Sequence, residues 1–336
     1  MRAKHYWTIS AVALFLAGMF CSCMRTGGGS VDCEVYGEAE TGVSICRYTL
    51  KKGDLKVRLT NLGGTLLGLE VPDRGGHMEN IVRGHISLDD YARSTASPNA
   101  VIGRGPRGEK LDKVIWDVEL LKEPDAVGVR LRFPGMHGAP GVKQASDLKN
   151  IVVTYWLNDD NEFEIVYEYV AGGIAPEGVT HNIYFSLCGT DGDGALDHQL
   201  AIAADNFYPV DKDQTLFGSH RSVRDTPFDF LNPERIGARI SSDDEQLQFG
   251  DGYNHCWTLN GGDDGDVVAT IFDPQSGRYM EIMTPNPCLQ FSSARPEDKL
   301  RPDNRGFCIK AQLPPGESVK AGELVRLRTV YHFSTL

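Results

Sequence analysis

The sequence lacks several features that would point to charged partners. Basic residues are the minority, with 34 Lys and Arg against 46 Asp and Glu and a formal net charge of −12. This balance argues against nucleic acid or an anionic membrane surface as a partner, because a negative protein repels both. There is also no block of like charge, since the acids are spread through turns such as Asp159-Asp160 and Asp263-Asp264. We interpret them as a solvated acidic surface.

Cysteine patterns that bind metal are missing as well. Of the 8 cysteines, none falls in a Cys-x-x-Cys pair or in a Cys/His spacing typical of zinc, so we expect no metal and no cofactor. Cys33 and Cys46 flank a short turn-rich segment, where an oxidising compartment permits a disulfide. The later cysteines lie in apolar runs and are expected to be buried free thiols: Cys188, Cys256, Cys288 and Cys308.

Helical periodicity is nearly absent, and residues 88–93 give at most one short turn. From Ser44 onward, runs of Val, Ile, Tyr and Phe alternate with polar residues and are interrupted by Gly, Pro, Asn or Asp. No linker-like boundary follows residue 35 and no internal repeat is present, which predicts one all-β domain, a large antiparallel β sandwich. Residues 158–161 predict a hairpin turn, and the clearest strands are 55–60, 127–133, 151–157, 163–169, 267–272, 279–283 and 324–333.

The first 23 residues predict a targeting segment. Arg2 and Lys4 give a basic start, and residues 7–20 form an apolar run. At about 14 residues, this run is too short for a stable transmembrane helix and suits a secretory signal. The Ser22-Cys23 pair that follows resembles a bacterial lipoprotein cleavage site, with Cys23 as the lipidated residue.

Two features depart from that pattern: Phe20 stands where Leu is usual, and Cys21 competes with Cys23. Simple cleavage and an uncleaved anchor are therefore alternatives to lipidation. We expect an exported bacterial protein, periplasmic or anchored in the outer membrane as a lipoprotein, with membrane contact only through the lipid. Residues 27–30, Gly-Gly-Gly-Ser, predict a flexible tether. The expected division is a signal at 1–23, a tether and N-terminal segment at 24–42, and the folded domain at 43–336.

One strand-like stretch carries the strongest functional signal. Residues 179–187 read Val-Thr-His-Asn-Ile-Tyr-Phe-Ser-Leu. They resemble the Leu-Thr-Asn-His-Ser-Tyr-Phe-Asn-Leu signature of the aldose 1-epimerases, or galactose mutarotases. Other segments between Tyr48 and His332 are similar to that family in order and spacing: 59–66, 71–76, 102–104, 208–211, 226–230, 236–237, 252–255, 273–278, 284–291 and 306–312. The resemblance implies the family's two-layer β sandwich, with a sugar cleft on one concave face.

The resemblance also implies a reaction, the interconversion of the α and β anomers of a sugar. This reaction removes the proton of the C1 hydroxyl and protonates the ring oxygen, after which the ring opens and closes again. An acid and a base must therefore flank the hemiacetal, each able to exchange a proton near neutral pH. In the family, a Glu is the base and a His is the acid. A second His, an Asp and an Arg orient the sugar.

The positions that match these residues hold other side chains in this chain. The family's Asn-His order occurs here as His181-Asn182, which puts an amide that does not titrate at the acid position. Lys310 occupies the base position and can act as a base only if its pKa is lowered well below about 10.4. The family's Asp matches Asn254, which keeps hydrogen bonding without charge.

The remaining family residues are also affected. The Leu-His-Gly-Gly loop that carries the second His is absent from the short segment between Arg104 and Trp116. The family's Arg aligns with Gly108, or with Arg107 after a one-residue slip. Both departures concern residues that position the sugar.

Three histidines are candidates for the missing acid. If 179–187 is one strand, Asn182 and Tyr184 share the polar face and His181 points with the apolar set, so His181 is expected to be a buried structural residue unless a bulge re-aims it. His137 lies in a Gly/Pro loop, where a surface role is the simpler interpretation, and His255 is expected to support its strand.

A set of polar side chains suited to sugar hydroxyls remains at the family's cleft positions. We prefer the hypothesis of a protein that binds a small-molecule sugar or glycan without the standard mechanism. The alternatives are retained mutarotation through a rearranged acid and base, another sugar-directed reaction that uses Lys310, and a scaffold without ligand. The oligomeric state stays open. The candidates for substrate contact are Arg104, Arg107, Tyr184, Gln290 and Gln312, beside Asn182, Asn254 and Lys310.

Overall fold

The computed structural model describes residues 24–26, 28–84, 87–88, 91, 98–103, 105, 109–134, 151–170, 178–190, 194–215, 219–293, 306–315, 319–320 and 322–336. Within these ranges no helix is both long enough and apolar enough to cross a membrane. Cys23, Arg104, Arg107 and His137 lie outside the described residues, as does the whole of segment 1–23. The targeting segment and the lipid anchor therefore stay predictions.

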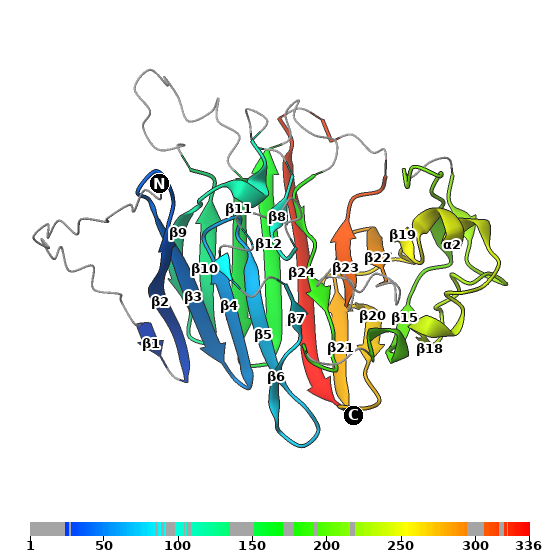
Figure 1. Ribbon diagram of the computed structural model, residues 1–336, viewed down its shortest axis with the longest axis horizontal. Coiled ribbons are helices and arrows are strands. Elements are labelled where there is room, and N and C mark those ends of the chain that lie inside the picture. Colours follow the sequence, from blue (N-terminus) through cyan, green and yellow to red (C-terminus); the bar gives the residue numbers. More distant parts are fainter. Residues whose placement is uncertain are drawn as a thin grey trace, which may run out of the picture.

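Strands account for most of the described chain (Figure 1). The first sheet contains β1 (Met24–Thr26), β2 (Gly29–Glu38), β3 (Ser44–Lys52), β4 (Leu55–Thr60), β5 (Leu66–Pro72) and β6 (Met78–Asn80). The largest contains β9 (Asp117–Lys122), β10 (Ala126–Arg132), β11 (Ile151–Asn158), β12 (Glu162–Val170), β15 (Gln199–Ile202), β18 (Glu234–Arg235), β20 (Val267–Phe272), β21 (Arg278–Met283) and β24 (Leu324–Thr335). A third contains β7 (Val82–Arg83), β14 (Tyr184–Phe185), β16 (Asn206–Tyr208), β17 (Arg221–Ser222), β19 (Asn254–Thr258), β22 (Cys288–Ser292) and β23 (Phe307–Gln312), and the smallest pairs β8 (Val101–Ile102) with β13 (Thr180–His181).

These sheets form the two layers of a sandwich. One layer is the nine-stranded sheet, in the order β18-β15-β20-β21-β24-β12-β11-β10-β9. The six-stranded sheet packs on it through β10 against β2 and β3, and the seven-stranded sheet packs on it through β24 against β23. In Figure 1 the blue strands of the six-stranded sheet overlie the green strands of the nine-stranded one. The prediction of an all-β antiparallel sandwich is confirmed.

The expected strands and the hairpin at 158–161 are also confirmed, because each expected run coincides with a strand to within one or two residues at either end. In the hairpin, the side-chain oxygen of Asn158 accepts hydrogen bonds from the backbone N–H of Asp160 at 3.0 Å and of Glu162 at 3.1 Å. Asn161 adopts φ 57°, a left-handed conformation that asparagine tolerates. Local turn chemistry thus fixes the register of β11 on β12.

Within the glycine-rich N-terminal segment, Gly29 and Ser30 are not part of the flexible tether that composition predicts. Gly29 and Ser30 begin β2, and Val31 lies in the hydrophobic core with 1% of its surface exposed. Gly29 is needed there because a Cβ would lie 2.7 Å from the Lys52 side chain and 3.0 Å from that of Val127. The glycine therefore permits a close approach between layers, and the folded part of the chain begins within segment 24–42.

One short helix was not expected from the sequence: α2 (Glu245–Gly250), which accompanies the 3-10 turns η1 (Leu111–Lys113), η3 (Gly194–Asp197) and η4 (Ile236–Ala238). The Asp244 carboxylate caps its first turn by accepting from the N–H groups of Gln246 and Leu247. Six residues are too few to show helical periodicity, which explains why the pattern gave no signal. Of the turn expected at 88–93, only Leu88 and Tyr91 are described, and both are helical.

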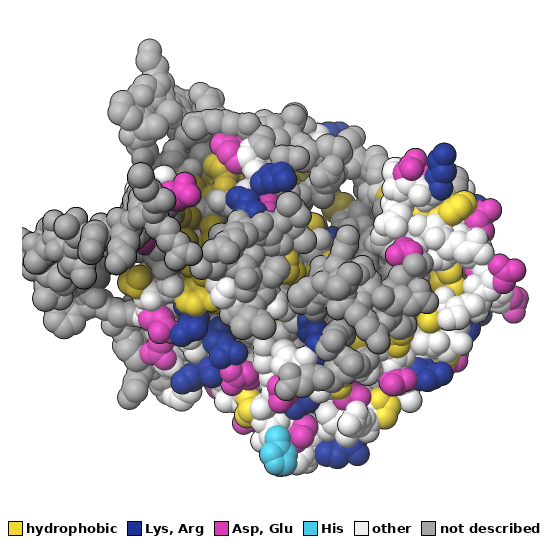
Figure 2. All heavy atoms as spheres, viewed as in Figure 1, with side chains coloured by type: hydrophobic (Ala, Val, Ile, Leu, Met, Phe, Trp, Pro, Cys, Tyr) yellow, Lys and Arg dark blue, Asp and Glu magenta, His cyan; other side chains and the backbone are white. Residues whose placement is uncertain are grey.

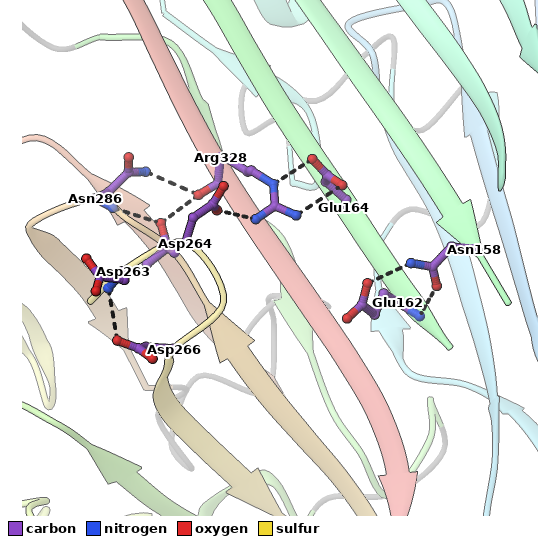
Figure 3. Close-up of polar contacts among 9 residues, drawn as sticks. Asn158, Glu162, Glu164, Asp263, Asp264, Asp266, Asn286 and Arg328 are labelled. Atoms are coloured by element: carbon purple, nitrogen blue, oxygen red, sulfur yellow. Dashed lines mark hydrogen bonds and ion pairs between the residues drawn. The ribbon is translucent and has the colours of Figure 1, made fainter. Parts of the chain in front are cut away.

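The outer side of the nine-stranded sheet carries an ionic cluster centred on Arg328 of β24 (Figure 3). The guanidinium donates to Glu164 of β12 at 2.8 Å and also contacts Asp264, which precedes β20. Burial lowers the pKa of Arg328, but the bonds and charges of the two carboxylates outweigh this effect and raise it. The cluster ties three segments that are far apart in the sequence.

On the face shown in Figure 2, acidic and basic side chains of the described residues are interspersed. Pairs across neighbouring strands of the six-stranded sheet give examples, such as Lys56 with Glu70 at 3.0 Å and Arg58 with Glu70 at 3.1 Å. Such exposed or half-exposed pairs contribute little to stability. They agree with a solvated surface that has no single-sign patch in the described part of this face.

The six described cysteines are free thiols. Cys256, Cys288 and Cys308 are buried as expected, whereas Cys188 is partly exposed and lies in a turn after β14. Cys33 and Cys46 are not directly opposite one another, because Cys33 pairs with Tyr48 and Cys46 pairs with Val35. They are diagonal neighbours, a placement that commonly exceeds the reach of a disulfide.

Candidate functional site

The stretch 179–187 is not the single strand that its pattern predicts. Thr180 and His181 form β13, which pairs with β8, whereas Tyr184 and Phe185 form β14, which pairs with β23 and β7. The chain changes partners at Asn182 and Ile183, so this segment joins two sheets. The break places Asn182 just before β14, an interior strand of the seven-stranded sheet.

Asn99 holds the break in place. Its backbone N–H donates to the carbonyl of Asn182 at 2.8 Å, and its side-chain oxygen accepts from the N–H of Tyr184 at 2.9 Å. Its amide nitrogen donates to the carbonyl of Arg83 in β7 at 2.6 Å. Asn99 is buried and left-handed at φ 62°, a conformation that asparagine adopts more readily than most residues. The backbone of Asn99 therefore ties down Asn182, and its side chain ties Tyr184 to the neighbouring strand β7.

The two sides of the broken stretch still differ as predicted, and the prediction of a structural His181 is confirmed. His181 is 1% exposed and lies between two tyrosines, with Nε2 2.9 Å from the Tyr155 hydroxyl and Nδ1 2.7 Å from the Tyr167 hydroxyl. Because Tyr155 donates to the carbonyl of Gly64, the arrangement fits a neutral ring protonated on Nε2 that accepts from Tyr167 on Nδ1.

Burial, with a smaller contribution from Lys310, lowers the pKa of His181 to about 4 against the opposing effect of the Gly64 carbonyl. The ring is therefore neutral at neutral pH, sealed in the core, and unavailable as a proton donor. His255 is similar, because burial lowers its pKa to about 3 and Nδ1 accepts from the N–H of Asn254 at 3.0 Å. Its ring packs against Phe228, which confirms that it supports its strand.

Asn182 faces the opposite way, toward a group of polar side chains on the adjacent strands. The alternation of β19, β22 and β23 presents these side chains on one side of the seven-stranded sheet while their apolar neighbours enter the core. Register places Gln290 directly opposite Lys310, and Asn254 directly opposite Ser292. We call this side the polar face; it is formed by Asn182, Asn254, Gln290, Ser292, Lys310 and Gln312.

At one end of the polar face, Asn254 is the centre of an amide network. Its side-chain oxygen accepts from Gln290 at 3.0 Å and from the Ser292 hydroxyl at 2.7 Å, and its nitrogen donates to Gln214 at 3.1 Å. Gln312 continues the network, donating to Cys256 at 3.2 Å and lying 3.4 Å from Gln290. The structure thus brings together three predicted residues: Asn254, Gln290 and Gln312.

At the other end, the Nζ of Lys310 donates to the side-chain oxygen of Asn182 at 2.7 Å. The two residues, separated by 128 positions in the sequence, therefore contact one another directly. Burial lowers the pKa of Lys310, and the neighbouring Cys308 and Cys256 thiols act in the opposite direction. No carboxylate among the described residues forms an ion pair with this lysine.

The other predicted contacts are placed only in part. Tyr184 lies opposite Cys308 across β14 and β23, half-buried and next to the polar face. Arg104 and Arg107 fall outside the described residues, so their predicted contact with substrate stays untested. All the described candidates for substrate contact lie on adjacent strands of the seven-stranded sheet or at the break beside it.

Sequence reasoning missed three residues that shape the site. Ser292 follows Gln290 by two positions in β22, so strict alternation was a signal that would have found it. Gln214 and Asn99 gave no comparable signal. Gln214 reaches Asn254 from a loop, and Asn99 acts from a left-handed position outside the periodic segments.

Chemically, the polar face offers amides, a hydroxyl and one amine. Amides and hydroxyls donate and accept hydrogen bonds and are suited to sugar hydroxyls, but they do not exchange protons near neutral pH. Among the described residues of this face, Lys310 and the buried thiols are the groups that titrate. The face therefore favours binding over acid–base chemistry of the kind that ring opening needs.

The fold itself is shared with sugar epimerases of known structure. Galactose 1-epimerase from Lactobacillus acidophilus superimposes with a TM-score of 0.75 at 20% identity, covering 91% of this chain and 98% of that one. An aldose epimerase homologue from C. elegans superimposes with a TM-score of 0.67 at 23% identity, covering 85% of this chain and 97% of that one. At these identities the likeness establishes a galactose mutarotase-like β sandwich.

Sequence comparison identifies the family. The family profile described as aldose 1-epimerase matches residues 105–329, more than half of the chain. Galactose mutarotase from Homo sapiens is 28% identical over 322 residues, covering 84% of this chain and 90% of the relative. Aldose 1-epimerase from Escherichia coli is 28% identical over 268 residues, covering 70% and 75%. The chain belongs to the aldose 1-epimerase family, as its motifs predicted.

Proposed function

We propose that this protein binds a sugar on its polar face and lacks the standard proton-transfer machinery of the aldose 1-epimerase family. The observation that carries the proposal is the 2.7 Å hydrogen bond between Lys310 Nζ and Asn182 Oδ1. These residues stand at the positions where the resemblance expects the base and the acid. An amide supplies no proton at any ordinary pH, and an ammonium accepts none until it has been deprotonated.

Binding is supported by the composition of the polar face. Asn254, Gln290 and Gln312 are linked to one another, which restricts their rotamers before a ligand arrives. Groups that are already ordered lose less conformational entropy on binding, so a modest number of hydrogen bonds suffices for a weak, specific site. Family membership supports a sugar as the ligand, because the relatives include a galactose mutarotase and an aldose 1-epimerase.

The proposal is tested by polarimetry and by ligand-observed NMR on the same preparation. We expect no acceleration of anomer equilibration of glucose or galactose over the spontaneous reaction, together with saturable binding of a methyl glycoside at about millimolar affinity. Lys310→Met should abolish the binding. A saturable rate increase lost in Lys310→Met would show that the site is catalytic. Absence of any binding across a panel of sugars would reject the sugar site.

A double variant, Lys310→Glu with Asn182→His, provides a further arm of the same assay. It restores the residue types of the family's base and acid at these two positions. We expect it to stay inactive, because the Leu-His-Gly-Gly loop is absent and Asn254 carries no charge. Restored mutarotation would show that the two substitutions alone account for the loss.

A further inference from the structure

Lys310 has surroundings that are unusual for an amine. Its Nζ contacts the Asn182 amide at 2.7 Å, Gln290 lies directly opposite on β22, and the Cys308 and Cys256 thiols are close enough to influence its charge. Within the described residues, no carboxylate neutralises it. An ammonium held against amides and thiols receives less stabilisation than one that is paired with an acid.

This neighbourhood favours the neutral amine. Burial lowers the pKa of Lys310, and the thiols that oppose this effect are themselves held protonated, since burial raises the pKa of Cys308 to about 11. A neutral lysine has a lone pair that attacks carbonyl carbon, the reaction by which lysines form Schiff bases. The polar face therefore presents an amine whose neutral, nucleophilic form is more accessible than that of a solvated lysine, together with amides that can hold hydroxyls.

The sugars that such a face would bind contain their own electrophile. A reducing sugar equilibrates between its ring and an open chain, and the open chain ends in an aldehyde at C1. We propose that Lys310 Nζ captures this aldehyde, so that the polar face takes reducing aldoses and holds their open-chain form as a Schiff base. This inference rests on the proposed sugar-binding function and names the ligand class and the atom that bonds to it.

The step is balanced without a further reactant. The lone pair of the Lys310 amine forms a bond to C1, the C=O π bond opens, and the oxygen takes up the first amine proton to give a carbinolamine. The carbinolamine then loses this oxygen as water together with the second amine proton, which leaves a C=N bond between C1 and Nζ. The reverse reaction, hydrolysis, releases the sugar unchanged.

The full chain incubated with galactose and cyanoborohydride tests the inference, because this reductant converts a Schiff base into a stable amine. Peptide mapping by mass spectrometry then locates the reduced hexose. We expect labelling at Lys310 to exceed that at the exposed Lys51 by at least about tenfold, since a bound sugar is held next to the amine. Excess methyl galactoside, which has no aldehyde, should suppress the labelling.

Lys310→Arg keeps a nitrogen donor at this position but forms no comparable adduct, and Lys51→Arg is the matched surface control. Binding of methyl galactoside is followed separately by NMR. If the glycoside binds but Lys310 is labelled no more than Lys51, or neither lysine is labelled, the Schiff base is overturned. The proposed sugar-binding function would then still stand. No glycoside binding and no selective label would reject both. Selective label at Lys310 that methyl galactoside competes away supports both.

Discussion

Two half-buried cations on opposite layers of this sandwich have opposite surroundings. Arg328, on the nine-stranded sheet, contacts two carboxylates, Glu164 and Asp264, and its pKa is raised (Figure 3). Lys310, on the seven-stranded sheet, contacts the Asn182 amide, and its pKa is lowered. Pairing compensates the cost of burying a charge in the first case, whereas that cost remains in the second. The contrast separates a cation whose charge is compensated by neighbouring carboxylates from one to which we assign a ligand in our proposal.

The largest effect that we expect concerns His181, which lies behind Lys310 on the core side. Its pKa of about 4 is below the unfolded value of 6.5, so the unfolded chain binds the proton first as the pH falls. Above about pH 6.5, His181 does not reduce the free energy of unfolding. As the pH falls toward 4, protonation of the unfolded chain reduces that free energy by about 3 kcal/mol for this residue. Urea titrations at several pH values should show a shallower decline in His181→Phe.

His220→Gln is the control for that measurement, because His220 is exposed. Its pH dependence should match that of the unmodified protein. An equal decline in His181→Phe and the unmodified protein would mean that His181 is protonated without cost and is not sealed in the core.

The second effect concerns the residue that presents Asn182 to Lys310. Asn99→Ala removes the side-chain bonds to Tyr184 and Arg83 and puts alanine at φ 62°, so we expect a loss of about 2 kcal/mol and weaker sugar binding. Chemical denaturation and NMR titration check both. Asn99→Gly tolerates the backbone conformation without the bonds and should recover only part of the stability. Full recovery would show that backbone strain, not the amide, is responsible.

The smallest expected effects come from two matched substitutions that test the contrast between Arg328 and Lys310. Arg328→Met leaves Glu164 and Asp264 without their partner and should cost about 1 kcal/mol, and high salt should reduce this cost. Lys310→Met removes a buried amine that has no acid beside it and should leave stability unchanged or raise it by up to about 1 kcal/mol. Thermal unfolding at matched ionic strength measures both. Equal destabilisation by the two variants would remove the distinction between them.

Much of the fold was predictable because its signals are local. The alternation in 151–157 and 163–169 and the Asn-Asp-Asp-Asn turn between them specify a hairpin without reference to the rest of the chain. The order of family motifs then placed Asn182, Asn254, Gln290, Lys310 and Gln312 at one site, and the structure gathers them on one sheet and the break beside it. Alternation also assigned His181 to the core, even though its strand is shorter than expected.

The errors occurred where a distant contact decides the outcome. Gly29 and Ser30 have the composition of a tether, yet both belong to β2. Gly29 packs so closely on the side chains of Lys52 and Val127 that a Cβ would not fit. The break at Asn182 depends on Asn99, whose hydrogen bonds to Asn182, Tyr184 and Arg83 have no signature in the sequence. Composition and periodicity describe a residue's neighbours in the chain, whereas these residues are determined by neighbours in space.

The sequence by itself determined the all-β fold and the family, and it predicts Asn182 and Lys310 at the positions of the family's acid and base. These properties follow from residue identity and from a period of two. Only the tertiary structure decided that the amide and the amine face one another, and that Arg328, on the other layer, is paired with carboxylates. The reason is physical: a buried charge takes its pKa from the groups that folding brings beside it, and those groups come from distant parts of the chain.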